Sequence, residues 1–373
     1  MTRAPVLSVL STVALAVACQ GPSPRLAEAR RDSDAGRSAA PAPAAIGDAG
    51  DSGGGDDASL GDAGDAEALA MDATPPLGDP MATHKETRDE LLGLFTIREM
   101  SERETAQLRP DAFLRTTFGT DGPWHMNQGN KAIALHATSR EACLAGLAGI
   151  VLQTPEQRAT CGAENMVPIA RAGKAPAYCI DVFEFPNRAC ELPIVWAAPS
   201  AAANVCKLQG KRLCTQGEWQ LACRADPDGG KDRRYAYGDS LDLEICNTHR
   251  PHRQRCDPRG PKTAWGTCTT DTEPSGAFPE CRSRFGVFDQ HGNVAEVMTR
   301  KDANGKVVTQ LKGSAWFYTE VAREPDRPPP ASTLYKTIAH ADHCNFDPRW
   351  HVEPIESAVH VNYHLGFRCC KSL

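Results

Sequence analysis

The residues best placed to do chemistry lie in one short polar segment, between positions 285 and 297. Asp289 and Glu296 supply two carboxylates seven positions apart, and Gly292-Asn293 lies between them. Ca²⁺ takes about six to eight oxygens from carboxylates, amides and main-chain carbonyls, gathered by a turn that contains glycine. The segment therefore predicts half of a calcium shell. The alternative is a hairpin turn whose Asp and Asn side chains bond to their own backbone.

This segment, Phe285-Gly-Val-Phe-Asp-Gln-His-Gly-Asn-Val-Ala-Glu-Val297, resembles a signature of the formylglycine-generating enzyme (sulfatase-modifying factor) family. Three further stretches resemble family motifs in the family order: Tyr178-Cys-Ile-Asp-Val-Phe-Glu-Phe-Pro-Asn187, Gly210-Lys-Arg-Leu-Cys-Thr-Gln-Gly-Glu-Trp219 and Leu365-Gly-Phe-Arg-Cys369. Each motif alone is a weak signal, but four in order are a strong one. The resemblance implies an α+β, irregular, C-type-lectin-like domain over residues 161–373, poor in regular structure and rich in disulfides.

The resemblance also implies two calcium sites. Positions that bind calcium in family members correspond here to Asp289, the carbonyls of Gly292 and Val294, and Glu296. The other candidate site holds Asn247, the Thr248 carbonyl and Asp257, although the Arg- and His-rich stretch between them departs from the family pattern.

One departure concerns catalysis. Catalytic family members follow an Arg-Gly-Gly-Ser-Trp-like turn with two cysteines that bind copper and attack the substrate cysteine. Here the turn is Lys312-Gly-Ser-Ala-Trp316, and the two cysteine positions are Tyr318 and Arg323. Neither residue replaces a thiolate, which is both the soft ligand for Cu(I) and the redox partner. Formylglycine formation is therefore disfavoured, unless Cys344 or another thiol pair substitutes.

A histidine-rich stretch offers a different metal chemistry. Five of the eleven histidines fall between positions 340 and 364: His340, His343, His351, His360 and His364. Neutral imidazole suits iron, copper or zinc. The alternative function is thus a metal-dependent oxidoreductase that uses non-haem iron or copper. These histidines can equally be surface residues of a Pro-containing loop. Arg368 is expected to be a structural ion-pair partner.

The cysteine count indicates an oxidising compartment. The chain has fifteen cysteines, and lipidation of Cys19 would leave fourteen, all between Cys143 and Cys370. In an exported protein this pattern is typical of a disulfide framework, here of up to seven bridges. No Cys-x-x-Cys pair with zinc spacing occurs. The pairing stays open, except that the adjacent Cys369 and Cys370 cannot easily bridge each other.

The N-terminus predicts export. Residues 1–18 have Arg3, a short apolar run and small residues before Cys19, as in a secretory signal peptide. A cysteine at this position resembles a bacterial lipobox, so we expect lipidation of Cys19 and anchoring to a membrane of the cell envelope, on the periplasmic side or the cell surface. Ordinary cleavage near Ala18 is the alternative.

Residues 19–82 read as a linker rich in Ala, Gly, Asp and Pro. Between Ser38 and His84 there are eight Asp, one Glu and no Lys or Arg. Such a composition cannot bury enough apolar surface to fold, so we expect a disordered, extended tether. The rest of the chain is close to charge balance, and nothing in it suggests a nucleic-acid partner.

The elements that must position these residues are short. In the lead-in, residues 83–160, we expect a helix from Glu86 to Leu108 ended by Pro110, and a second from a Thr138-x-x-Glu141 capping box to Leu152. A packed accessory layer is favoured there over a partner-binding module. In the main domain we expect a buried strand at 193–196, a helix at 201–208 and another opened by a Thr215-x-x-Glu218 capping box.

The sequence thus predicts an exported lipoprotein with a calcium- and disulfide-stabilised, non-catalytic binding or structural module. Its ligand would be a protein or a glycan.

Overall fold

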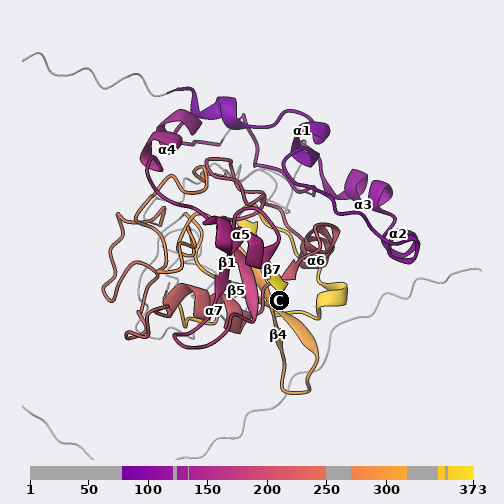
Figure 1. The fold of residues 1–373 in the computed structure, drawn as a ribbon. Helices are drawn as coiled ribbons and strands as arrows, with labels where there is room; N and C mark the ends of the chain where they lie inside the picture. Colours follow the sequence, from indigo (N-terminus) through magenta and orange to yellow (C-terminus); the bar gives the residue numbers. More distant parts are fainter. Residues whose placement is uncertain (1–77, 121–123, 133, 249–269, 317–342, 349–351) are drawn as a thin grey trace, which may run out of the picture. The chain divides into compact units, whose positions relative to one another are not determined.

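Two small β-sheets and a set of short helices are the regular elements of the described chain in the computed structural model (Figure 1). The described residues are 78–120, 124–132, 134–248, 270–316, 343–348 and 352–373. The expected mixture of helix and sheet is confirmed. No helix among these residues is long and apolar enough to cross a membrane.

The first sheet joins the C-terminus to the middle of the chain. Its strands follow the order β1 (Met166–Ile169), β2 (Tyr178–Asp181), β7 (Cys369–Ser372) and β3 (Arg212–Leu213), and all neighbours are antiparallel. Three of the four family-like stretches therefore lie in one sheet or directly beside it.

The second sheet holds the central loop. It follows the order β5 (Val307–Lys312), β4 (Ala295–Lys301) and β6 (Leu365–Gly366), with β4 antiparallel to β5 and parallel to β6. Glu296 lies opposite Lys312 on one side and Gly366 on the other. This register brings the loop, the Lys312–Trp316 turn and the C-terminal motif together.

Helices α6 (Pro199–Leu208) and α7 (Gln216–Arg224) support the sheets. The expected capping box at the start of α7 is confirmed, because Thr215 and Glu218 exchange hydrogen bonds with each other's backbone amides. The expected strand at 193–196 is wrong. Val195 makes only an isolated bridge to Asn127, and Trp196 has φ 59°, which interrupts an extended run.

The lead-in has more and shorter helices than predicted: η1 (Pro80–Thr83), α1 (Arg88–Leu92), α2 (Glu102–Leu108), α3 (Pro110–Thr117), α4 (Arg140–Gly146) and α5 (Pro155–Cys161). The single helix from 86 to 108 is wrong because Thr87 and Ser101 each form a capping box, and so each starts a helix of its own. Pro110 starts α3 rather than only ending a helix, since proline suits the first turn.

The second predicted lead-in helix is also shorter than expected. Its N-cap is Ser139 rather than Thr138, and it ends at Gly146. Gly149, with φ 81°, turns the chain before α5 begins. A further short 3₁₀ turn, η4 (Ile355–Ser357), lies near the C-terminus.

The lead-in packs on the main domain as an accessory layer, as expected. A single buried cluster joins Leu91, Phe95 and Phe118 to Phe185 and Phe367. The Phe185 and Phe367 rings stack with centroids 4.6 Å apart. Burial of these apolar side chains favours the association of the two parts.

The disulfide framework is confirmed for the twelve cysteines that the structure describes. Six bridges join Cys143–Cys190, Cys161–Cys179, Cys206–Cys369, Cys214–Cys370, Cys223–Cys344 and Cys246–Cys281. The adjacent Cys369 and Cys370 bond to different partners, in line with the prediction. Cys19, Cys256 and Cys268 lie outside the described residues.

Candidate functional site

The central loop is a tight, buried turn. Asp289, Gly292 and Asn293 all adopt left-handed backbone conformations, with φ of 54°, 76° and 56°. Gly292 is required for a second reason: a Cβ there would lie 2.3 Å from the carbonyl oxygen of Asn247. Only glycine allows this approach of the two backbones. The structure thus brings Asn247 against the loop, whereas the sequence placed them in two separate sites.

A chain of hydrogen bonds orients the two asparagine amides. The Asn293 Oδ1 accepts the Glu273 amide at 2.8 Å, and its Nδ2 donates to Glu184 Oε2 at 2.6 Å. These bonds set which end of the Asn293 amide is oxygen. The Asn247 Nδ2 donates to that oxygen at 3.0 Å, so the Asn247 Oδ1 points away from it. This Oδ1 is buried and has no hydrogen-bond partner among the described atoms.

Glu184 is a central residue that the sequence analysis missed. Its carboxylate accepts the Val294 amide at 3.0 Å and the Ser275 hydroxyl at 3.2 Å, besides the Asn293 side chain. Burial, with the nearby charges of Asp289 and Glu296, raises the pKa of Glu184 well above its usual value. Its position in the family-like stretch 178–187 was the signal that could have identified it, but the sequence analysis gave that stretch no chemical role.

The two carboxylates of the predicted calcium loop have separate partners. Asp289 Oδ2 accepts the Gly276 amide at 2.7 Å, and burial raises the pKa of Asp289 to about 7. Glu296 pairs with Arg368, whose Nη2 lies 2.5 Å from Oε1, and it also accepts the Trp219 indole N–H at 2.6 Å. The expected ion-pair role of Arg368 is confirmed.

These contacts fit a calcium ion only in part. Both Glu296 oxygens are engaged by Arg368, so an ion at Glu296 would compete with a buried guanidinium. The Asn247 Oδ1, in contrast, is a buried oxygen that a hard cation would satisfy. The amides of Gly292 and Val294 donate to Ser314 and Glu184. Calcium binding stays a prediction, with Asn247 as its best-fitting ligand.

Comparison with known proteins assigns the family. The model of the sulfatase-modifying factor enzyme 1-like domain matches residues 184–373, which is just over half of the chain. The chain belongs to this family. The match takes in the central loop, the Lys312–Trp316 turn and Arg368, so their resemblance to family motifs is confirmed at the level of the domain.

Two relatives of this sulfatase-modifying-factor-like chain carry the name inactive C-alpha-formylglycine-generating enzyme 2. The one from Mus musculus is 31% identical over 134 residues, and the one from Bos taurus is 31% identical over 130 residues. Each match covers 35% of this chain and spans 39% or 40% of the relative's length. Among solved structures, CarF is 13% identical, covers 66% of this chain and 86% of its own, and has a TM-score of 0.31.

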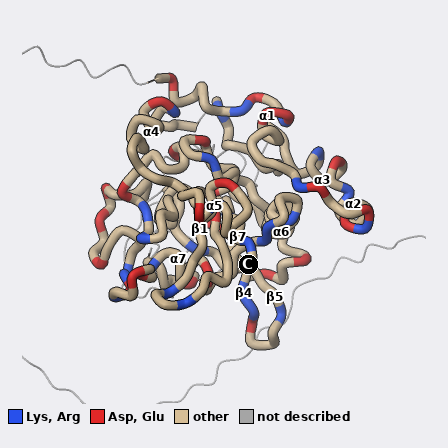
Figure 2. Tube along the Cα trace, in the orientation of Figure 1, with Lys and Arg blue, Asp and Glu red and all other residues tan. Residues whose placement is uncertain are grey.

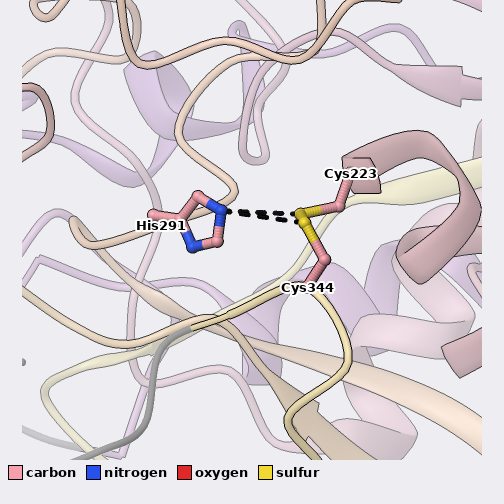
Figure 3. A group of neighbouring side chains, drawn as sticks. All are labelled: Cys223, His291 and Cys344. Atoms are coloured by element: carbon pink, nitrogen blue, oxygen red, sulfur yellow. Dashed lines mark hydrogen bonds between the residues drawn. A yellow bond between two sulfur atoms is a disulfide. The ribbon is translucent and has the colours of Figure 1, made fainter. Parts of the chain in front are cut away.

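Tyr318 and Arg323, which the resemblance places at the family's two catalytic cysteine positions, lie outside the described residues. Cys344, the thiol considered as a substitute, is joined to Cys223 in a disulfide (Figure 3). Every described cysteine of this family member is likewise paired. The described part of the domain therefore offers no thiolate for Cu(I) or for attack on a substrate.

A histidine faces this disulfide. His291 Nε2 lies 3.5 Å from Cys223 Sγ and 3.9 Å from Cys344 Sγ, and all three residues are buried (Figure 3). The Ala236 amide donates to the same Nε2 at 2.9 Å, so this nitrogen carries no proton. The three donor atoms lie within 4.8 Å of one another, as metal ligands would. The disulfide, however, removes the two thiolates that such a site needs.

The C-terminal histidines do not form a comparable group in the described chain. His340 and His351 lie outside it. Of the others, His343 packs against Phe346 and His364 against Tyr363, while burial lowers the pKa of His360. None of these three belongs to a cluster of metal-ligating side chains among the described residues.

Proposed function

We propose that this chain is a non-catalytic member of the sulfatase-modifying factor family. It acts as a binding or structural module, stabilised by disulfides and calcium and held at the cell envelope by a lipid on Cys19. The observation that carries the proposal is the disulfide between Cys344 and Cys223. It bonds the sulfur of Cys344, the named candidate to replace the missing catalytic pair.

Two further observations support the non-catalytic role. The relatives that match this chain are themselves named inactive. The polar side chains of the central loop bond to other residues of the domain: Glu296 pairs with Arg368, and Asn293 donates a hydrogen bond to Glu184. A buried loop held in this way braces the domain, so a protein or glycan partner would bind elsewhere on its surface. The envelope location is supported by the residues before Cys19.

A direct assay tests the absence of catalysis. The full chain, incubated with copper, oxygen and a peptide that contains cysteine, is expected to leave the peptide's mass unchanged. Titration of the folded protein with a thiol reagent should find no accessible thiol. Conversion of the peptide cysteine to an aldehyde would overturn the proposal, and a pair of free thiols would identify the residues responsible.

The oxidoreductase alternative rests on His291 beside the Cys223–Cys344 pair, a group that could ligate a metal only with this disulfide reduced. Metal analysis of the full chain by mass spectrometry separates the two functions. Calcium without a transition metal is expected for the binding module. Stoichiometric iron or copper would favour the oxidoreductase, and His291→Gln would then show whether this residue holds the metal.

A further inference from the structure

Five cationic residues line one cleft in the described part of the chain. The cleft has a volume of about 700 Å³ and is lined by Arg98, Arg140, Arg158, Arg188 and Lys211. Glu164 is the one carboxylate in its lining, and Leu94, Phe95 and Pro186 contribute apolar surface. Its lining residues come from the lead-in and from the main domain, so the cleft exists only once the two have packed together.

Three of these cations have carboxylate partners. Arg158 pairs with Glu164 at 2.6 Å, Arg98 with Glu104 at 2.5 Å, and Lys211 with the buried Asp181 at 2.6 Å. These pairs hold the side chains in place and offset their charge. The charges of the other two cations, Arg140 and Arg188, therefore make the net charge of the cleft positive.

Arg188 and Arg140 have no carboxylate partner among the described residues. Arg188 donates to the carbonyl oxygens of Leu94 and Gly93, which orient the guanidinium without neutralising it. Arg140, the first residue of α4, is exposed, and its side chain makes no hydrogen bond or ion pair with the described residues. Elsewhere, basic and acidic residues are interspersed, as along α1, α2 and α3 in Figure 2.

We propose that this cleft binds a small organic oxyanion, a molecule that carries a sulfate, phosphate or carboxylate group on a compact body. Guanidinium groups bind such groups with paired, charge-assisted hydrogen bonds. The volume falls within the roughly 300–1,000 Å³ of small-molecule sites. This inference gives a ligand class to the proposed binding function and rests on it.

The test measures binding of three probes to the full chain: inorganic sulfate, inorganic phosphate and citrate. Isothermal titration calorimetry at constant ionic strength is expected to show saturable binding of at least one probe, and the ranking of the three identifies the preferred oxyanion. Arg140→Glu should weaken that binding by about tenfold, since the reversal replaces an attraction by a repulsion.

The matched control is Arg103→Glu. Like Arg140, Arg103 is an exposed arginine in the first turn of a short helix, but it does not line the cleft. Acidic residues are favoured at this end of a helix, so neither substitution there should unfold the protein. Binding should survive in Arg103→Glu. Absence of saturable binding, or equal weakening in the control and the cleft variant, would overturn the inference.

The two proposals fail in different ways. Aldehyde formation on a cysteine peptide would overturn the non-catalytic function whatever the cleft binds. A cleft that binds none of the three probes would overturn the oxyanion proposal but would not contradict the non-catalytic function.

Discussion

Arg368 and Glu296 form a bidentate ion pair from which solvent is excluded. The Arg368 Nε lies 2.8 Å from both Glu296 oxygens, and the two side chains are 0% and 1% exposed. Arg368 also donates to the carbonyl oxygen of Phe288. One guanidinium therefore ties the C-terminal motif to both ends of the central loop.

Breaking this pair should be costly. We expect Glu296→Gln to lower the free energy of unfolding by about 3–5 kcal/mol, because Arg368 would keep a buried charge without a counter-ion. Urea denaturation measures the change. The control is Glu164→Gln, whose pair with Arg158 lies in solvent with side chains 71% and 62% exposed, so its effect should be small. If both variants lost the same free energy of unfolding, the buried pair would contribute no more to stability than the exposed one.

Calcium dependence should follow Asn247 rather than Glu296. The sequence predicted that Asp289 and Glu296 both belong to a calcium shell. The structure shows Glu296 on Arg368 and a buried Asn247 oxygen without a partner. We expect calcium to raise the stability of the parent chain by about 2–3 kcal/mol at a hundred times its dissociation constant. Asn247→Ala should lose that increment, while Glu296→Ala should lose stability equally in calcium and in chelator.

Thermal melts in calcium and in chelator measure this prediction. Asn304→Ala, in an exposed turn, serves as the control and should respond to calcium like the parent. If the parent melts at the same temperature in both buffers, the loop is a hydrogen-bonded turn that binds no calcium.

Asp289 should make stability fall as pH rises from about 4 to 7. Burial raises its folded pKa to about 7 from the usual 3.8 of an aspartate. A carboxyl with a raised folded pKa contributes stability that is present below the unfolded pKa and is lost as pH rises through the folded one. We expect Asp289→Asn, which keeps the shape and cannot ionise, to flatten this slope by up to about 4 kcal/mol between pH 4 and pH 7. An unchanged slope in the variant would show that Asp289 ionises normally.

His84 and His136 should have the opposite effect on stability, which they should lower as pH falls. They are buried with ring centroids 4.6 Å apart, and they contact the carbonyl oxygens of Gln128 and Thr272. Burial lowers the pKa of His84 to about 3, helped by the charge of His136, and lowers that of His136 to about 4. A depressed folded pKa gives stability that is present above the unfolded value of 6.5 and is lost as pH falls below it.

We expect acidification from pH 7 to pH 4.5 to remove on the order of 3–5 kcal/mol through this pair. His84→Gln/His136→Gln should abolish that loss, as read by urea denaturation across the pH range. His125→Gln, at a less buried position, is the control and should keep the parent's response. A double variant with the parent's slope would contradict the prediction.

Local signals in the sequence predicted much of the framework. The four motifs identified the family, and the Thr215–Glu218 capping box located α7, because both depend on residues close together in the chain. The cysteine count predicted a disulfide framework. The lead-in was predicted less well. Thr87 and Ser101 each cap the start of a separate helix. The many good helix formers around them led to the prediction of one long helix.

By itself, the sequence determined the family and the mixed fold, and it predicted Tyr318 and Arg323 in place of the two catalytic cysteines. Only the tertiary structure decided which cysteines pair, and hence that Cys344 is bonded to Cys223 across 121 residues. It also decided that Glu184 and Asn247 meet at the central loop, and that Glu296 faces Arg368. These contacts join residues far apart in the chain. Their formation depends on how the two sheets pack, which no local pattern encodes.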